Sequence, residues 1–283
     1  MKFGSKTRAA HHRLLARRAC AWLRAPHIAG MPPTCLNDRA VISIAARSGD
    51  PQEAADFLQG VVTADVKDRL PTWSALLTPQ GKVLFEFIVW AAHDGLLVDC
   101  EAAAADALAK RLKLYRLRRE IDIVRENRLT VHWAPRVVEG AANDPRLDAL
   151  GYRWIAPINS TAAAPSAPGA DEDWRVHRLR LGVAEGHKEL GSGETFWLEC
   201  NAMELHGVSF TKGCFVGNEN TAGMNWRQKI NRRLLVVPLA QSDQKRQRVA
   251  YPALGLAVDL VRVEKLGTAG LPKWLITDPD HAA

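Results

Sequence analysis

The chain of 283 residues is long enough for one large domain or two to three small ones, each with a buried core. Its hydrophobic fraction of 47% and charged fraction of 24% are ordinary for a globular protein. No apolar run approaches the roughly 20 residues that a membrane-spanning helix needs. A transmembrane protein is therefore excluded, and no membrane partner is predicted.

The net charge of +7 is confined to the first 30 residues, which hold seven lysines and arginines and no acidic residue. The remaining residues carry 31 basic and 31 acidic side chains. A body without net charge lacks the basic surface of a phosphate-backbone binder, so no specific nucleic-acid partner is predicted. The composition of residues 1–30 is typical of a transit peptide, a disordered basic arm or a segment upstream of a start at Met31. We expect an unstructured extension without chemistry.

The five cysteines are an odd number, widely spaced and without a C-x-x-C pair. This pattern argues against a disulfide framework and against a self-contained zinc or cluster site, so no intrinsic metal is predicted. It indicates a reducing compartment.

Strands dominate the first predicted elements. Alternating apolar residues and turn-forming segments predict a strand, a helix and three more strands, at residues 40–45, 50–60, 73–77, 83–90 and 96–99. Glu86 lies between Phe85 and Phe87, and this alternation predicts that its carboxylate faces solvent. The alternative is a buried Glu86 that exchanges protons with a ligand.

An amphipathic helix is predicted at residues 101–119, with Leu108, Leu112 and Tyr115 at helical spacing. Lysines and arginines are concentrated in its second half. They either interact favourably with the negative end of the helix dipole or bind the carboxylates of a ligand. The elements expected after it are a hairpin (121–124 and 129–133), a strand (136–138), a turn (141–145), a loop (159–170), a helix capped by Asp171 (172–181) and two strands (234–239 and 256–263).

The octapeptide of residues 212–219, K-G-C-F-V-G-N-E, concentrates reactive groups in a short span. Gly213 and Gly217 permit a sharp turn or close approach to a ligand. Lys212 lies two residues from Cys214, where its charge would favour the thiolate. The Glu219 carboxylate could accept hydrogen bonds from the N–H groups of a flat heterocycle. The alternative is a glycine-rich turn around a small buried thiol.

The octapeptide resembles the K-G-C-[FY]-x-G-Q-E signature of the YgfZ family, folate-binding proteins that support iron–sulfur cluster assembly. That family is related in fold to the T-protein, the aminomethyltransferase of the glycine cleavage system. Asn218 stands where the family has Gln, and Gly223 stands where an Arg usually follows. Further segments that resemble the family are residues 56–66, 113–121 and 178–186.

The resemblance implies an α+β fold, the T-protein-like folate-binding fold of antiparallel sheets with helices plus a small C-terminal β-barrel. Residues 31–230 would form the folate-binding region as two α+β subdomains, with the loop at 159–170. Residues 231–283 would form the barrel, shortened because residues 241–250 are polar and basic where the family usually has a strand.

The resemblance also implies a tetrahydrofolate-binding accessory protein for the assembly or repair of [4Fe–4S] proteins, a maintenance factor rather than an enzyme. Cys214 would be the reactive or structurally critical thiol, Lys212 its electrostatic tuner and Glu219 a ligand or loop-organising carboxylate. The implied folate contacts are Gly213, Gly217, Asn218, Glu219, Tyr115 and Arg118. The implied partners are folate and iron–sulfur client or assembly proteins. We expect a monomer in the bacterial cytoplasm, or in the mitochondrial matrix if residues 1–30 are a transit peptide.

A folate-dependent aminomethyl or one-carbon transferase is the alternative function. In the T-protein, the strand that matches residues 83–90 carries a pair of acidic residues. Here Phe85 takes the place of one member of that pair beside Glu86, which disfavours the transfer reaction.

Overall fold

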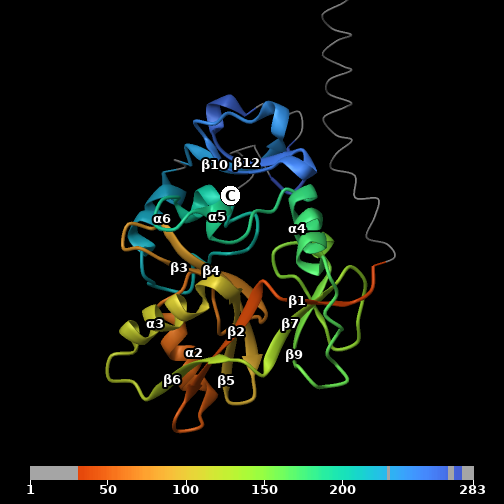
Figure 1. The fold of residues 1–283 in the computed structure, drawn as a ribbon. Helices are drawn as coiled ribbons and strands as arrows, with labels where there is room; N and C mark the ends of the chain where they lie inside the picture. The colour runs from red at the N-terminus through yellow and green to blue at the C-terminus, as the bar shows by residue number, and fades with distance from the viewer. Residues whose placement is uncertain (1–30, 228–229, 267–270, 276–283) are drawn as a thin grey trace, which may run out of the picture.

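Three antiparallel sheets organise the chain, as the computed structural model shows for residues 31–227, 230–266 and 271–275 (Figure 1). The predicted α+β class is confirmed, whereas the extension predicted at residues 1–30 lies outside the described residues. Within the described ranges, no helix has the length and apolar character that crossing a membrane requires.

The first sheet has five strands in the order β3-β4-β5-β2-β6, each antiparallel to its neighbours. Helices α2 and α3 pack on one face of this sheet and form a core with it (Figure 1). Helix α2 begins after Asp50, whose side chain accepts a hydrogen bond from the backbone N–H of Gln52. The elements are β2 (Arg39–Ala46), α2 (Pro51–Gln59), β3 (Thr72–Leu77), β4 (Val83–Ala92), β5 (Gly95–Glu101), α3 (Ala105–Arg116) and β6 (Ile121–Glu126).

Strand β4 is an interior strand with a packed core on each face, so it has no solvent side. Phe85 and Phe87 belong to the core under the helices, and Ile88 belongs to the core on the other face. The prediction that Glu86 faces solvent is therefore wrong, because its side chain is buried. Alternation of apolar and polar residues along a strand indicates solvent exposure of the polar ones only where one face of the sheet faces water.

The second sheet has the order β1-β7-β9-β8, with strands at Thr34–Leu36 (β1), Leu129–Ala134 (β7), Ala142–Asn143 (β8) and Tyr152–Pro157 (β9). The hairpin predicted over residues 121–133 is wrong. A turn at residues 127–128 does separate the two strands, but they do not pair with each other: β6 pairs with β2 in the first sheet and β7 pairs with β1 in the second. The strand predicted at 136–138 does not form.

Helix α4 (Ala170–Arg180) begins after Gly169, which has a left-handed backbone conformation, so the cap predicted at Asp171 is wrong. The Asp171 carboxylate instead accepts hydrogen bonds from the Asp38 backbone N–H at 2.8 Å and the Asn37 side chain at 3.2 Å. It thus ties the β1–β2 turn to α4. Two shorter helices follow, α5 (His187–Leu190) and α6 (Asn218–Trp226).

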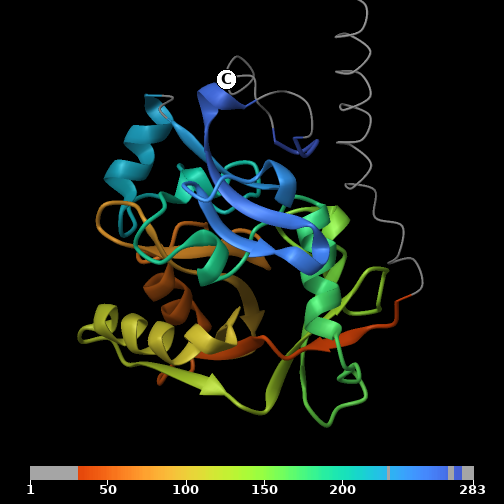
Figure 2. The ribbon, with the colours of Figure 1, turned by 45° about the horizontal axis from the view of Figure 1, so that its top comes forward.

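The C-terminal sheet has the order β10-β12-β11 and lies over the region of α4 and α5 (Figure 2). Its strands are β10 (Arg232–Pro238), β11 (Gln247–Tyr251) and β12 (Leu256–Arg262). The described part of residues 231–283 is an open sheet rather than a closed barrel. An Arg232–Glu199 ion pair of 2.8 Å and a hydrogen bond of 2.8 Å from Asn201 to the Leu234 carbonyl join this sheet to the preceding segment.

Candidate functional site

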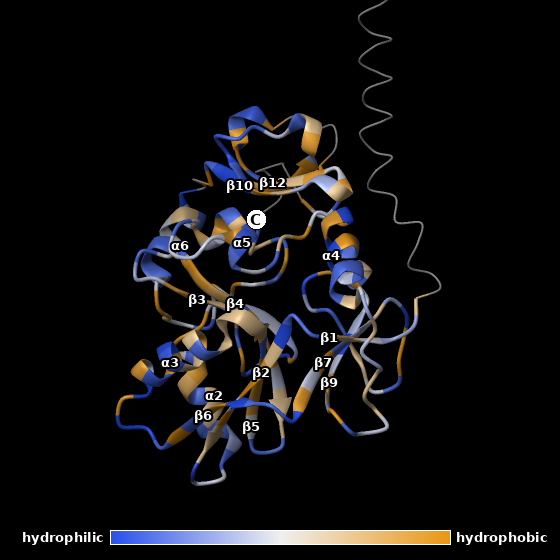
Figure 3. Cartoon of the chain, viewed as in Figure 1, coloured by the Kyte–Doolittle hydropathy of each residue, from blue (hydrophilic) through white to orange (hydrophobic). Residues whose placement is uncertain are grey.

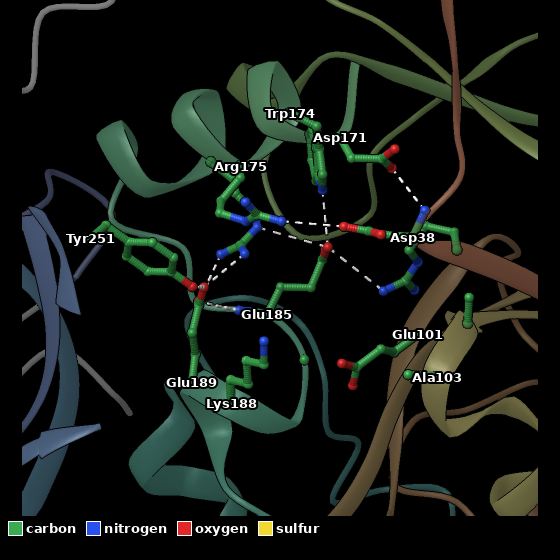
Figure 4. Close-up of a pocket in the computed structure, with 14 residues that line it drawn as sticks. Asp38, Glu101, Ala103, Asp171, Trp174, Arg175, Glu185, Lys188, Glu189 and Tyr251 are labelled. Atoms are coloured by element: carbon green, nitrogen blue, oxygen red, sulfur yellow. Dashed lines mark hydrogen bonds and ion pairs between the residues drawn. The ribbon is translucent and has the colours of Figure 1, made fainter. Parts of the chain in front are cut away.

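A cavity of about 250 Å³ lies where the first sheet, α4, α5 and the C-terminal sheet meet (Figure 4). Its walls come from the β1–β2 turn, the end of β5, α4, α5 and the end of β11. They combine carboxylates, cations and aromatic rings, chiefly Asp38, Glu101, Trp174, Arg175, Lys188 and Tyr251.

A buried ionic cluster forms the floor of this cavity. It contains four arginines and five carboxylates, all less than 10% exposed: Arg39, Arg146, Arg153, Arg178, Glu86, Asp99, Asp144, Glu185 and Glu189. A charge removed from water is tolerated only when an opposite charge and hydrogen bonds compensate it. The cluster supplies opposite charges at 2.6–3.1 Å, although Nε and Nη2 of Arg153 and Nε of Arg178 donate no hydrogen bond to a described residue. Its members come from both N-terminal sheets and from α4 and α5, so it holds these elements together.

Glu185 lies at the centre of the cluster. Its carboxylate accepts hydrogen bonds from Arg146 at 2.6 Å and from the Trp174 indole at 2.9 Å. Burial alone would raise the pKa of Glu185, but four surrounding guanidinium groups hold it well below its ordinary value. Glu185 is therefore ionised at neutral pH, and it fixes the position of the Trp174 ring in the cavity wall.

Glu189 joins α5 to α4 and to the C-terminal sheet. Arg178 donates to both of its oxygens at 2.7 Å, and the Tyr251 hydroxyl donates to one of them at 2.6 Å. Burial and the Glu189 charge raise the pKa of Tyr251 above its ordinary value, so the hydroxyl stays a donor at neutral pH. The aromatic side of the cavity is thus held rigidly.

Other lining groups remain available to a ligand. Glu101 is 28% exposed and accepts one hydrogen bond, from the backbone N–H of His187 at 2.9 Å. Figure 4 shows Glu101 and Lys188 on opposite sides of the cavity. The cavity therefore offers acceptors on one wall and cations on another, beside the Trp174 and Tyr251 rings. Such a set suits a flat ligand with N–H donors and a separate anionic group.

The octapeptide of residues 212–219 forms an exposed loop that leads into α6, with Phe215 as its buried anchor. The Lys212 ammonium donates to the carbonyls of Gln59, Val62 and Ala64, the last at 3.0 Å. Burial lowers the pKa of Lys212 to about 8. The hydrogen bonds of this ammonium thus go to the α2–β3 connection. Cys214 is exposed, whereas the other described cysteines are buried.

Replacing Lys212 with methionine is expected to lower the free energy of unfolding by about 1–3 kcal/mol at pH 7, because three carbonyls lose their donor. The folded chain releases this proton near pH 8 and the unfolded chain near 10.5, so unfolding takes up a proton between these values. The advantage of the wild type should therefore widen from pH 8 to 10.5. Urea unfolding at several pH values tests this, with Lys245→Met as an exposed control. A gap that stays constant would refute it.

Gly217 lets the loop approach the turn between β3 and β4. Its φ is +83°, and a Cβ there would lie 2.6 Å from the Thr78 carbonyl oxygen. Gly213 also has a positive φ, +94°, but a Cβ at that position would meet no atom within 4 Å. Close packing of the loop therefore requires glycine at 217 in particular.

The Gly217→Ala protein should lose roughly 2 kcal/mol more stability than Gly213→Ala, because both substitutions strain the backbone and only the first creates a clash. Chemical unfolding of the two variants measures the difference. Equal losses would mean that the loop moves away from the β3–β4 turn without cost.

Comparisons with known proteins place the chain in a family. The human iron–sulfur cluster assembly factor IBA57, a mitochondrial protein, is 31% identical to this chain over an alignment of 257 positions. The alignment covers 77% of this chain and 72% of the human protein. The chain belongs to the IBA57/YgfZ family. A mitochondrial IBA57 homologue from Pyricularia oryzae is 30% identical over 238 residues and is covered over 60% of its length. No family model matches the chain.

The fold of this IBA57/YgfZ member is that of the T-protein. The aminomethyltransferase T of the Bartonella henselae glycine cleavage system superposes with a TM-score of 0.60 over 90% of this chain and 83% of that one, at 12% identity. The predicted T-protein-like fold is thereby confirmed.

The residues that the resemblance to the IBA57/YgfZ family suggested as site residues lie apart from the cavity. None of the eight is among its lining residues. The loop supplies six of them, with Glu219 exposed in the first turn of α6, while Tyr115 and Arg118 lie at and beyond the end of α3. Their predicted roles as folate contacts stay predictions. Sequence reasoning missed Arg178 and Glu185, although both belong to the family-like segment 178–186.

Proposed function

We propose that this chain binds tetrahydrofolate in the cavity and supports the assembly or repair of iron–sulfur proteins. The observation that carries the proposal is the 31% identity with human IBA57, whose name records iron–sulfur cluster assembly, over 77% of the chain. The T-protein-like fold and the K-G-C-F-V-G-N-E loop support it. The location, in the bacterial cytoplasm or the mitochondrial matrix, and the monomeric state belong to the same proposal.

The lining of the cavity fits a reduced folate. A pterin ring carries N–H donors along one edge and a flat face, which match the Glu101 carboxylate and the Trp174 and Tyr251 rings. The glutamate part of folate is anionic and would find the cation of Lys188 and that of Arg175, which would exchange its ion pair with Asp38 for the ligand. Sites for drug-sized ligands span roughly 300–1,000 Å³, so a cavity of about 250 Å³ suits the ring end and leaves the rest of the ligand outside.

The exposed thiol of Cys214 would act on a client or assembly protein and would take no part in binding folate. Because the loop does not line the cavity, the thiol is open to a client or assembly protein rather than to the ligand. In this proposal folate binding and thiol chemistry take place at separate sites of the protein. Lys212 would then act by holding the loop on the α2–β3 connection.

A one-carbon transferase remains the alternative, and the surroundings of Glu86 argue against it. One carboxylate oxygen accepts from the Trp73 indole at 2.8 Å, and the other accepts from Arg39 at 3.1 Å. Neither Glu86 nor Phe85 lines the cavity of about 250 Å³; both border a separate small pocket of about 10 Å³. Production of methylene-tetrahydrofolate from tetrahydrofolate and an aminomethyl donor by the purified protein would favour the transferase instead.

Complementation tests the proposed function. Cells that lack their own family member should regain the activity of [4Fe–4S] enzymes when they express this chain. The Lys245→Met protein, altered at an exposed position outside the cavity lining and the loop, serves as a control. Normal expression without recovery of those activities would contradict the proposal.

A further inference from the structure

The end of α3 carries an exposed patch that neither the cavity nor the Cys214 loop explains. Five exposed cations lie there, and none of them forms an ion pair with a described residue: Lys110, Arg111, Lys113, Arg118 and Arg119. Two leucines lie among them, with Leu114 63% exposed and Leu117 85% exposed. We call these seven residues the α3 patch. In Figure 3 the α3 helix shows hydrophobic and hydrophilic colours side by side.

The spacing places these side chains together. Residues three and four apart are neighbours on a helix surface, so Leu114 is flanked by Lys110 and Arg111. The opposite face of α3, with Leu108 and Leu112, packs in the core. The patch is therefore the outer face of a firmly docked helix. An apolar centre with a charged rim is the usual arrangement of a protein interface.

Helix stability explains only part of this composition. Cations in the last turn interact favourably with the helix dipole, which accounts for Lys113 and Arg116. Arg118 and Arg119 lie beyond the helix end, and like charges at close spacing repel one another. The exposed leucines gain nothing from the dipole. The composition thus costs the free protein stability, as expected for a surface that is covered by another molecule.

The backbone at Leu117 adds an independent observation. Its φ of 54° and ψ of −115° lie outside the ordinary helix and strand regions, where a non-glycine residue is strained. Glycine would adopt this conformation at little cost. A residue with a strained backbone and an apolar side chain that is 85% exposed does not stabilise the fold.

We propose that the α3 patch docks an acidic segment of a partner protein, one that presents apolar side chains between aspartates and glutamates. Carboxylates would pair with the five cations, and the apolar side chains would cover Leu114 and Leu117. A nucleic acid would satisfy the cations and leave the leucines in water. A flat anionic membrane would also meet the carboxylates of Glu120 and Asp106 beside the patch, which are 68% and 80% exposed although they pair with Arg47 and Arg125. A narrow protein segment avoids both problems.

The patch is small, so the contact would be transient and strengthened by charge. It lies outside the cavity lining and the Cys214 loop, so this inference goes beyond the proposed function and does not depend on it.

Fluorescence anisotropy on the full chain tests the proposal with a labelled peptide of about 15 residues that has leucines at helical spacing and glutamates elsewhere. At about 0.15 M salt, Lys110→Glu, Arg111→Glu and Lys113→Glu combined should weaken binding about tenfold or more. The control combines Arg69→Glu, Arg128→Glu and Arg136→Glu, which reverses the same number of exposed charges elsewhere and should have an effect of roughly twofold or less. Because both proteins keep residues 1–30, the basic extension contributes equally to each.

Leu117→Gly separates docking from folding. It should raise the melting temperature, because glycine relieves the backbone strain, and it should also weaken peptide binding. If charge reversal impairs folding, the Lys110→Gln, Arg111→Gln and Lys113→Gln combination replaces it. Equal loss in the patch and control proteins would overturn the proposal. So would patch-dependent binding of phosphatidylserine vesicles or single-stranded RNA that exceeds binding of the peptide.

Discussion

The Asp99→Asn protein is expected to lose about 3–5 kcal/mol of its free energy of unfolding, because a neutral amide then replaces the carboxylate that pairs with two buried guanidinium groups and turns an N–H donor toward one of them. Asp99 is fully buried on β5. One of its oxygens accepts from Arg39 at 2.6 Å and the other accepts from Arg153 at 2.7 Å. Burial would lower the pKa of Arg39, but the nearby carboxylates raise it well above its ordinary value. The Arg39 guanidinium therefore does not reduce the cost of its burial by losing its proton.

The matched control is Asp122→Asn. Asp122 also pairs with an arginine, Arg47, but both side chains are half exposed and water screens their attraction. Urea unfolding should show a far smaller loss for Asp122→Asn than for Asp99→Asn. Similar losses would mean that water reaches the buried cluster and that it does not hold the sheets together.

The Cys214→Ala protein should fold normally and fail in iron–sulfur maintenance. The thiol is exposed, so its removal leaves no cavity in a core. Because the thiolate is the form of cysteine that acts as nucleophile and metal ligand, recovery of [4Fe–4S] enzyme activity in complemented cells should fall about tenfold or more.

Cys200→Ala is the control for this experiment. Burial raises the pKa of the Cys200 thiol well above its ordinary value, so it stays protonated and unreactive. Its replacement should lower stability and leave recovery intact wherever the protein accumulates. A Cys214→Ala protein that restores activity as well as the wild type would assign the thiol a purely structural role.

Patterns of apolar, turn-forming and capping residues predicted most of the helices and strands, because these signals lie within a few residues of the element itself. The strands at residues 40–45, 73–77, 83–90 and 96–99 and the helix after Asp50 all form close to the predicted positions. The hairpin at 121–133 is wrong because the turn at 127–128 leads from one sheet to the other, and the strands on its two sides pair with the distant residues 34–46 rather than with each other. Long-range pairing of this kind leaves no trace in the spacing of neighbouring residues.

The cavity could not be predicted in the same way. Arg153 and Asp99 are 54 residues apart, and each looks like an ordinary surface charge until the two sheets bring them together. One signal was present, since Arg178 and Glu185 both belong to the segment that resembles the family. The octapeptide resembles the signature of the family, but none of its residues lines the cavity.

A crystal structure of the protein soaked with tetrahydrofolate tests the proposed ligand site most directly. We expect the bicyclic ring inside the cavity of about 250 Å³, beside Trp174 and with its N–H edge toward Glu101. Calorimetry on the same preparation establishes that the ligand binds in solution. A ring seated on the loop of residues 212–219, with the cavity empty, would contradict this assignment.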